Sequence, residues 1–262
     1  MYAIERHERI AELLQASGRV TVTELADSLS VTAETVRRDL DALERQGALR
    51  RVHGGAVASG KTSVVESTVA DRAGQAREAK LAIARAAFAL IGDDFRGSIL
   101  LDAGTTTGAL AELLADWRGN GSSSITVITN SVPIAALLHH NPAIDLHLLG
   151  GSVRGVTSAA VGGSTLEQLA HLRPDIAFVG ANGLSVDFGL STPEEREATV
   201  KSAMVRSARR TVALVDSSKL GDEALYRFAE LRDLDTVISD ADPLGTLSAA
   251  LDADEVEVIV AS

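Results

Sequence analysis

The sequence has no cysteine, few aromatic residues and no long apolar run. Without cysteine, a disulfide framework, a thiolate zinc site and a cysteine nucleophile are all excluded. Aromatic residues make up only 3%, so Ala, Val, Leu and Ile must fill the core. The apolar runs are far too short to cross a bilayer, and Met1–Glu12 is dense in charges of both signs, unlike a signal peptide. These absences favour a cytoplasmic protein that has no membrane partner.

A surplus of positive charge is also missing, because the net charge is −11. The acidic excess is uneven, however. Residues 1–58 hold 8 Lys/Arg and 9 Asp/Glu, whereas the remaining residues hold 17 and 27. Five arginines fall within a short stretch of the first segment: Arg37, Arg38, Arg45, Arg50 and Arg51. Since local charge matters more than total charge for binding DNA, the N-terminal segment remains a candidate DNA-binding domain.

With 262 residues, of which 45% are apolar, the chain is long enough for two domains with packed cores. The residue patterns divide it into a DNA-binding domain over 1–57, a linker and the start of a connecting helix over 58–75, and an α/β domain over 76–262. We find no internal repeat and no low-complexity segment.

Helical periodicity predicts three helices at the N-terminus. Residues 1–17 form the first, which ends at Gly18, and the capping box Thr21-Val-Thr-Glu24 opens the second. The third begins after Thr32 and ends at Gly47, and its inward face recurs at i, i+4 and i+7: Val36, Leu40 and Leu43. The segment 48–55 predicts a short two-stranded wing with a glycine turn. Together these elements have the spacing of a winged helix-turn-helix.

The outward residues of the third helix and of the wing are the candidate DNA contacts. Arginine can bind guanine through two parallel hydrogen bonds, and threonine can contact a thymine methyl group. The predicted DNA-binding residues are Thr21, Thr32, Ala33, Glu34, Thr35, Arg37, Arg38, Arg50, Arg51 and His53. The alternative from periodicity alone is a three-helix bundle whose arginines merely solvate its surface.

From residue 98 onward, short β-branched runs alternate with segments of helical length. The candidate strands are Ser98–Asp102, Ile125–Thr129, Asp145–Leu149, Asp175–Val179, Thr211–Val215, Thr236–Ser239 and Glu257–Val260. Because these strands are nearly all apolar, they predict a mostly parallel sheet that is covered on both faces by helices. A long helix is predicted within Val69–Ile91.

Polar and glycine-rich turns follow several of these strands. The run Gly104-Thr-Thr-Thr107 leads into a helix, where free backbone amides and the helix dipole can bind an anion. Ligands of open α/β sheets bind beyond the carboxyl ends of the strands. Lys219, with Lys201 as a second candidate, would pair with a phosphate. Each feature taken singly also fits an ordinary capped turn or a solvated surface lysine.

Two sets of motifs resemble the DeoR family of transcriptional regulators. The first is Val31-Thr-Ala-Glu-Thr-Val-Arg-Arg-Asp-Leu40 with Arg51-Val-His-Gly-Gly-Ala56. The second includes Leu101-Asp-Ala-Gly-Thr-Thr-Thr107, Ala177-Phe-Val-Gly-Ala-Asn-Gly183 and Leu214-Val-Asp-Ser-Ser-Lys219. The resemblance covers nearly the whole chain. One small departure is Thr32, where the family usually has serine, and both residues cap helices.

This resemblance implies a regulator, most commonly a repressor of sugar-metabolism genes, that binds a double-stranded DNA operator as a homo-oligomer. It further implies a sensor domain similar in fold to pentose-phosphate isomerases, a sugar-phosphate effector, and neither a cofactor nor a metal. The residues implied for the effector site are Asp102, Gly104, Thr105, Thr106, Thr107, Asn130, Ser131, Gly150, Gly151, Gly180, Asn182, Lys201 and Lys219.

Two alternatives stay open. The first is a sugar-phosphate isomerase with an appended DNA-binding domain. The isomerases place two aspartates in an Asp-Gly-Ala-Asp turn, but the matching residues here are Val179 and Asn182, which cannot exchange a proton, so no catalytic residue is predicted. Glu194-Glu-Arg-Glu197 is interpreted as a solvated first helical turn. The second alternative is a protein-binding adaptor, which does not account for a helix-turn-helix beside an anion-binding sheet.

Overall fold

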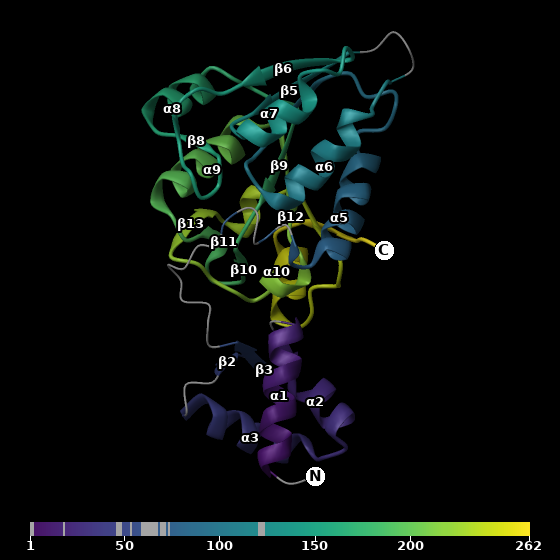
Figure 1. Cartoon of the computed structure of the whole chain (residues 1–262), viewed down its shortest axis with the longest axis vertical. Helices are drawn as coiled ribbons and strands as arrows, with labels where there is room; N and C mark the ends of the chain where they lie inside the picture. The colour runs from purple at the N-terminus through teal and green to yellow at the C-terminus, as the bar shows by residue number, and fades with distance from the viewer. Residues whose placement is uncertain are drawn as a thin grey trace. The chain divides into compact units, whose positions relative to one another are not determined.

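The chain folds into two units, Met1–Val65 and Glu66–Ser262 (Figure 1). The computed structural model describes residues 3–17, 19–45, 49–52, 54–58, 68, 72, 74–119 and 124–262. Each unit has a hydrophobic core of its own: one in the first unit and two in the second.

Three helices form the core of the first unit, as the periodicity predicts: α1 (Ala3–Ser17), α2 (Val22–Leu29) and α3 (Ala33–Arg45). The predicted inward face of the third helix is confirmed, because Val36, Leu40 and Leu43 are all buried. They pack with Ile10 of α1 and Leu25 of α2 in one cluster. This core holds α3 so that its opposite face is exposed.

The predicted wing is present as strands β2 (Leu49–Val52) and β3 (Gly55–Ala58), which pair antiparallel. A third strand, β1 (Arg19–Thr21), pairs with the other side of β3, and three residues were too few to reveal it in the sequence. Gly55 is required there, since a Cβ atom at this position would lie 2.0 Å from the carbonyl oxygen of Val20. Gly18 and Gly47, predicted to end two helices, lie outside the described residues.

All seven predicted strands of the second unit are confirmed, and they form one sheet. In chain order they are β4 (Ser98–Leu101), β5 (Ile125–Thr129), β6 (Ile144–Leu148), β9 (Ile176–Gly180), β12 (Arg210–Leu214), β14 (Thr236–Ser239) and β15 (Glu257–Val260). The spatial order is β15-β14-β12-β9-β4-β5-β6, and every neighbouring pair runs parallel.

Helices cover both faces of this sheet, because successive strand residues point to opposite sides. Ile99 and Leu101 of β4 belong to the core beneath α5 (Arg77–Ala89), α6 (Thr105–Ala115) and α7 (Val132–Leu138). Leu100, between them, belongs to the core beneath α8, α9 and α10. Figure 1 shows α5 and α6 on one side of β9 and β12, and α8 and α9 on the other. The bounds of that second layer are Gly163–Ala170, Glu195–Ser207 and Thr246–Ala253.

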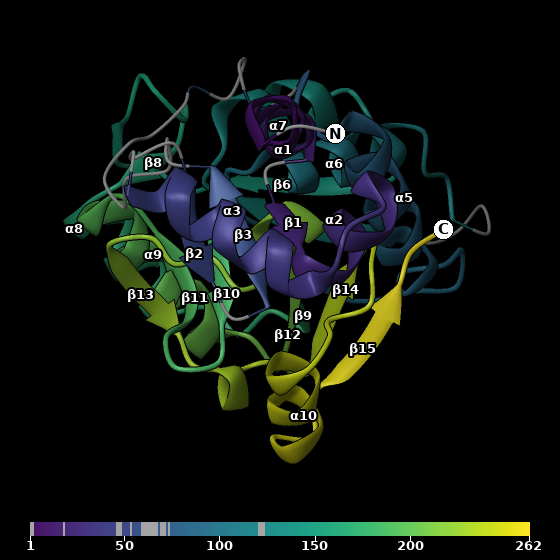
Figure 2. The ribbon, with the colours of Figure 1, turned by 90° about the horizontal axis from the view of Figure 1, so that it is seen from below.

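Short antiparallel pieces lie outside the main sheet, and the sequence did not predict them. One small sheet has the order β10 (Gly183–Ser185), β11 (Gly189–Thr192), β13 (Tyr226–Ala229), and these strands lie side by side in Figure 2. A two-stranded pair joins β7 (Ser152–Val153) to β8 (Ala160–Val161). Two 3-10 turns, Ser217–Lys219 and Leu231–Asp233, complete the unit. Strands of two to four residues are too short to show a period.

Candidate nucleic-acid interface and candidate ligand pocket

Threonine hydroxyls cap the N-terminus of each helix of the helix-turn-helix, α2 and α3. The amide of Glu24 donates to Thr21 Oγ1 at 3.2 Å, and the amide of Thr21 donates to Glu24 Oε2 at 2.9 Å, so the predicted capping box is confirmed. The amide of Thr35 donates to Thr32 Oγ1 at 3.2 Å, which makes Thr32 the cap of α3. Ser30, between the helices, is left-handed (φ 53°). These threonines thus have structural roles, and their contacts with DNA stay a prediction.

The outer face of α3 exposes charged side chains. Arg37 and Arg38 are 53% and 78% exposed, and both lie close to Glu34, at 3.7 and 3.3 Å. Exposed ion pairs of this kind contribute about 0–1 kcal/mol, so either arginine can exchange Glu34 for a base or a phosphate at little cost. Ala33, predicted to face outward, is partly buried and packs against the core. The first helical turn therefore offers a narrower surface than the sequence suggested.

The wing is tied to α3 through Arg51. Its backbone amide donates to Glu44 Oε1 at 2.8 Å, and its guanidinium pairs with Asp41. This arrangement fixes the distance between the wing and the third helix. Of the other predicted wing contacts, His53 and the side chain of Arg50 lie outside the described residues.

A buried ion pair joins α3 to α1. Arg6 donates two hydrogen bonds to the Asp39 carboxylate, at 2.7 and 3.0 Å, and His7 Nε2 lies 3.1 Å from it. Burial by itself would raise the pKa of Asp39, but the hydrogen bonds from Arg6 and His7 outweigh it and hold that pKa below its usual value. The ionised carboxylate therefore stabilises the orientation of α3 above the usual Asp pKa of about 3.9.

Replacing Asp39 with Asn should loosen α3. We expect a loss of about 1–3 kcal/mol, because Arg6 loses its charged acceptor. Hydrogen–deuterium exchange of residues 33–45 should speed up, whereas Asp27→Asn, an exposed change on α2, should leave it unchanged. In the wild type, protection of 33–45 should fall as the pH drops below about 3.9 toward the lower folded pKa. If the Asn variant shows the same fall, Asp39 is not its cause.

The candidate ligand pocket lies where the strand order reverses. From β4 the chain proceeds through β5 to β6 in one direction, whereas β9, on the other side of β4, leads through β12 and β14 to β15. Carboxyl ends of strands at such a switch point open a crevice, because the following loops turn in opposite directions. Asp102 and Gly104 follow β4, and Gly180 ends β9, so all three lie at this point.

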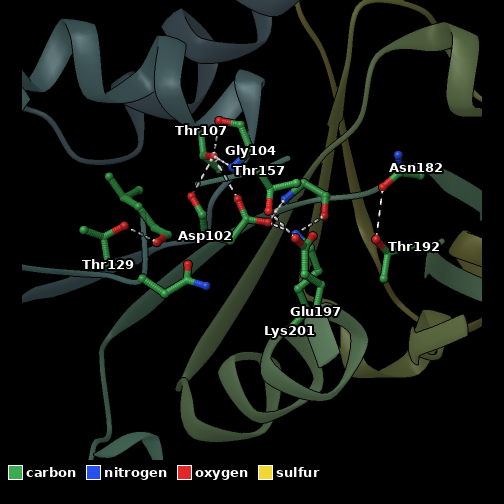
Figure 3. Close-up of polar contacts among 12 residues, drawn as sticks. Asp102, Gly104, Thr107, Thr129, Thr157, Asn182, Thr192, Glu197 and Lys201 are labelled. Atoms are coloured by element: carbon green, nitrogen blue, oxygen red, sulfur yellow. Dashed lines mark hydrogen bonds and ion pairs between the residues drawn. The ribbon is translucent and has the colours of Figure 1, made fainter. Parts of the chain in front are cut away.

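Asp102 joins four elements at the base of the crevice (Figure 3). It is 1% exposed and accepts hydrogen bonds from Thr107 Oγ1 at 2.8 Å and from the Gly180 amide at 2.9 Å. It also forms an ion pair with Lys201 of α9, whose ammonium group donates to the Gly180 carbonyl at 3.0 Å. Asp102 therefore positions the surrounding residues.

The first turn of α6 lies above this carboxylate. The Gly104 amide donates to Thr107 Oγ1 at 3.0 Å, and a Cβ atom on Gly104 would lie 2.9 Å from that oxygen, so glycine fits best here. Gly104, Thr105 and Thr106 line the cavity beside the turn. Amides in a first helical turn have no acceptor within the helix, so this end of α6 attracts an anion.

A cavity of about 50 Å³, called the cationic cavity below, opens at this turn. The chain contains four lysines, and three of them line it. The lining consists of Arg72, Gln75, Ala76, Lys80, Ala103, Gly104, Thr105, Thr106, Gly180, Ala181, Asn182, Glu197, Lys201, Leu214, Asp216, Ser218 and Lys219. Among these described residues, four side chains are cationic and two are carboxylates, which gives a formal charge of +2.

Lys80 and Arg72, which precede the first strand of the main sheet in the sequence, add positive charge to the cationic cavity. Lys80 Nζ donates to the backbone carbonyls of Arg72 and Gln75. Burial lowers the pKa of Lys80, the nearby Lys219 and Arg72 lower it further, and Asp216 opposes them. The Nε and Nη2 atoms of Arg72 are buried and have no hydrogen-bond partner among the described residues. Buried donors of this kind usually have an acceptor in folded proteins, so these nitrogens can donate to a group that enters the cavity.

A second, larger cavity of about 480 Å³, called the wide cavity, opens between α5, α6 and α7. It shares Lys80, Ala103, Gly104 and Thr105 with the cationic cavity. Its remaining lining residues are Gly74, Arg77, Leu81, Gly108, Ala109, Glu112, Ser131, Pro133, Ile134, Leu137 and Thr157. The two cavities therefore meet at the first turn of α6.

Family models match both units. Residues 6–62 match the DeoR-like helix-turn-helix domain, and residues 75–241 match the DeoR C terminal sensor domain. The chain belongs to the DeoR family of transcriptional regulators. Within the part of this family member that the structure describes, no helix is both long and apolar enough to span a membrane.

Curated relatives of this DeoR-family chain are named as transcriptional regulators, and several of them as repressors. It is 35% identical over 260 residues to the HTH-type transcriptional repressor GlcR of Bacillus subtilis (strain 168), covering 99% of this chain and 97% of the relative. The lactose phosphotransferase system repressor of Lactococcus lactis subsp. lactis is 35% identical over 90% of each chain. The glycerol-3-phosphate regulon repressor of Haemophilus influenzae is 31% identical over 93% and 91%.

Solved structures similar to the DeoR-family sensor include a ribose 5-phosphate isomerase A from Methanocaldococcus jannaschii. It is 23% identical, with a TM-score of 0.40, and the match covers 55% of this chain and 54% of that one.

The DeoR-family sensor brings eight of the thirteen predicted effector residues to the two cavities. Gly104, Thr105, Thr106, Gly180, Asn182, Lys201 and Lys219 line the cationic cavity, and Ser131 lines the wide cavity. The other five line neither of these cavities: Asp102, Thr107, Asn130, Gly150 and Gly151. Thr107 is bonded to Asp102, and Asn130 donates to the Ala160 carbonyl at 2.9 Å. Gly150 is bonded to Thr165 and Gln168 on α8.

The interpretation of 194–197 as a solvated first helical turn is confirmed for Glu195 and Arg196, which are exposed at the start of α9, and is wrong for Glu197. Glu194 caps α9 by accepting from the Glu197 amide at 2.9 Å. Glu197 is 5% exposed and forms an ion pair with Arg154. It also accepts a hydrogen bond from Thr157 (Figure 3). The cause is tertiary, because the loop between β7 and β8 packs Arg154 and Thr157 against the start of α9. Sequence spacing could not show this, since Arg154 is 43 residues away.

Two cationic residues of the pocket were not predicted: Arg72, because 58–75 was interpreted as a linker and the start of a connecting helix, and Lys80, which was assigned only to the long helix within Val69–Ile91. The sequence did contain one signal for Lys80. The buried face of α5 is Lys80, Ile83, Ala84 and Ala87, so a lysine occupies the first position of an otherwise apolar helical stripe. A lysine at such a position is almost never buried without a functional or structural partner. For Arg72 the sequence offered no comparable signal.

Proposed function

We propose that this chain is a cytoplasmic repressor of sugar-metabolism genes that releases its operator when it binds a phosphorylated sugar. Two N-terminal units of a homo-oligomer would bind two half-sites, each with α3 in a major groove. A coupling of about 1–3 kcal/mol between the ligand pocket and DNA would change operator affinity roughly 5- to 150-fold. The repressors of lactose and glycerol-3-phosphate systems among its relatives support this direction of regulation.

One observation supports the phosphorylated ligand most directly: the cationic cavity has an excess of two positive charges beside a helix N-terminus. A phosphate monoester has a charge of about −1.5 to −2 at pH 7, which would balance that excess. The buried nitrogens of Arg72, which have no acceptor within the described part of the chain, would gain acceptors from it. Leaving such a group unsatisfied costs about 1–3 kcal/mol, so occupation of the cavity would recover free energy.

We propose binding without catalysis. The turn after β9 has Val179 and Asn182, and neither side chain can act as a general base at pH 7. Glu197 does reach the cationic cavity, but its Oε1 atom already forms an ion pair with Arg154 and accepts a hydrogen bond from Thr157. These contacts hold the Glu197 side chain toward the loop between β7 and β8. Detection of isomerised product from a sugar phosphate incubated with purified protein would favour the isomerase alternative instead.

The test is a fluorescence-anisotropy titration of full-length protein against DNA from upstream of its own gene. It is run at two salt concentrations, with and without a panel of sugar monophosphates, and random duplex is the control DNA. We expect operator binding that weakens with salt and weakens further with one member of the panel. If no panel member binds the protein or alters its affinity for DNA, the proposed effector class is wrong.

Lys219→Ala should separate ligand binding from DNA binding. Operator affinity without ligand should stay within about twofold, whereas the ligand concentration needed for half-maximal release should rise roughly 10- to 150-fold, because a charge-assisted hydrogen bond of about 1.5–3 kcal/mol is lost. Arg232→Ala removes a 72% exposed cation of the same unit and should change neither value. If the ligand response of Lys219→Ala is the same as that of the wild type, Lys219 does not contact the ligand.

A further inference from the structure

The two cavities differ in size in a way that limits what each can hold. A buried water needs about 10–15 Å³ of cavity volume, so the cationic cavity of about 50 Å³ has room for only about four waters. That space suits a phosphate group but is too small for a sugar. The wide cavity, at about 480 Å³, falls in the range of small-molecule sites, and the two meet at Gly104 and Thr105.

The lining of the wide cavity is chemically suited to a neutral sugar body. Leu81, Ile134 and Leu137 provide apolar surface for the C–H faces of a ring or chain, and Arg77 and Glu112 provide a donor and an acceptor for hydroxyls. Apolar walls with a few polar groups are usual for pockets that orient small ligands. Lys80 is shared with the cationic cavity, and the formal charges of the other two ionisable residues, Arg77 and Glu112, cancel, so the rest of this cavity offers no excess charge for a second phosphate.

We propose that the effector is a monophosphorylated sugar or polyol that spans both cavities, and that the α6–α7 side of the wide cavity selects which one binds. This inference rests on the proposed function and adds to it the number of phosphates and the place where specificity is decided. The phosphate lies in the cationic cavity, and the neutral body extends across the first turn of α6 along Gly108 and Glu112.

Gly108 offers a sharp test, because it lines the wide cavity in the second turn of α6. A Cβ atom built on Gly108 meets no atom within 4 Å, so a larger side chain enters the cavity without displacing the fold. Gly108→Leu should therefore fill the space proposed for the sugar body while leaving the cationic cavity open. Gly108→Ala is the small control. Gly163→Leu is the matched control, since Gly163 is an exposed helical glycine of α8 whose Cβ also meets nothing.

Binding is measured by isothermal titration calorimetry on the full-length variants. The probes are inorganic phosphate, glycerol 3-phosphate, and a panel of pentose and hexose monophosphates and bisphosphates. For the sugar monophosphate that binds the wild type best, we expect Gly108→Leu to raise Kd at least about tenfold. The Kd of inorganic phosphate should stay within about twofold, and Gly163→Leu should match the wild type with both probes.

The other possible results of this experiment contradict either this inference alone or the proposed function as well. If Gly108→Leu binds the sugar monophosphate as the wild type does, or if a bisphosphate binds best, this inference is wrong and the proposed function stands. If Gly108→Leu instead changes the oligomeric state in sedimentation velocity and leaves ligand binding unaltered, the wide cavity is an interface between copies, which also overturns it. If the wild type binds neither phosphate nor any sugar phosphate, the proposed function itself fails.

Discussion

Asp102→Ala should destabilise the sensor unit by about 3–5 kcal/mol, the largest effect we expect from a single substitution. The change leaves the Lys201 ammonium buried without its carboxylate partner, and it removes the acceptor of Thr107 and of the Gly180 amide. Breaking one side of a buried ion pair costs far more than the pair contributes, because the remaining charge is no longer compensated.

Urea unfolding followed by tryptophan fluorescence can measure this loss. Trp117 is the only tryptophan, it is 2% exposed, and its indole donates to the Gly92 carbonyl at 3.0 Å within the sensor unit. Asp145→Ala, a 67% exposed aspartate on the edge strand β6, should cost less than about 0.5 kcal/mol. Adding Lys201→Met to Asp102→Ala should recover much of the loss. If Asp102→Ala unfolds like the wild type, the pair is not a structural anchor.

Arg37→Ala should reduce the preference for operator over random duplex by about 1–3 kcal/mol, or roughly 5- to 150-fold. Arg37 is exposed on α3, and its ion pair with Glu34, at 3.7 Å, is long and exposed, so the side chain can rotate toward a guanine. The measurement is the ratio of Kd values for operator and random DNA, by fluorescence anisotropy at two salt concentrations.

Arg9→Ala is the matched control, because Arg9 also forms an exposed i,i+3 pair, with Glu12 on α1. It should leave the specificity ratio unchanged. Equal weakening of operator and random DNA by Arg37→Ala, with the salt slope reduced by about one, would mean that Arg37 contacts only a phosphate.

Local sequence patterns were sufficient to predict the three N-terminal helices and the seven strands of the main sheet. The stripe Val36, Leu40, Leu43 faces the core of the first unit, and the capping box at Thr21 opens α2, because both features depend on neighbours within one or two helical turns. The seven predicted runs are the seven strands of the parallel sheet. The inner strands are apolar almost throughout because helices cover them on both faces, whereas the edge strands β6 and β15 are partly exposed. The missed strands, such as β1 and β10, are three residues each and have no readable period.

The candidate ligand pocket could be predicted only in part from local sequence patterns. The sequence by itself determined that glycine and hydroxyl turns follow the strands, and it therefore indicated the first turn of α6, Lys201 and Lys219. Only the tertiary structure decided that β4 lies beside β9, which makes Asp102 a buried anchor and moves Gly150 to a contact with α8. It also brought Arg72 and Lys80 to the cationic cavity and paired Glu197 with Arg154. The reason is that burial and charge pairing depend on distances in space between residues as far apart as 99 positions along the chain, which no local period records.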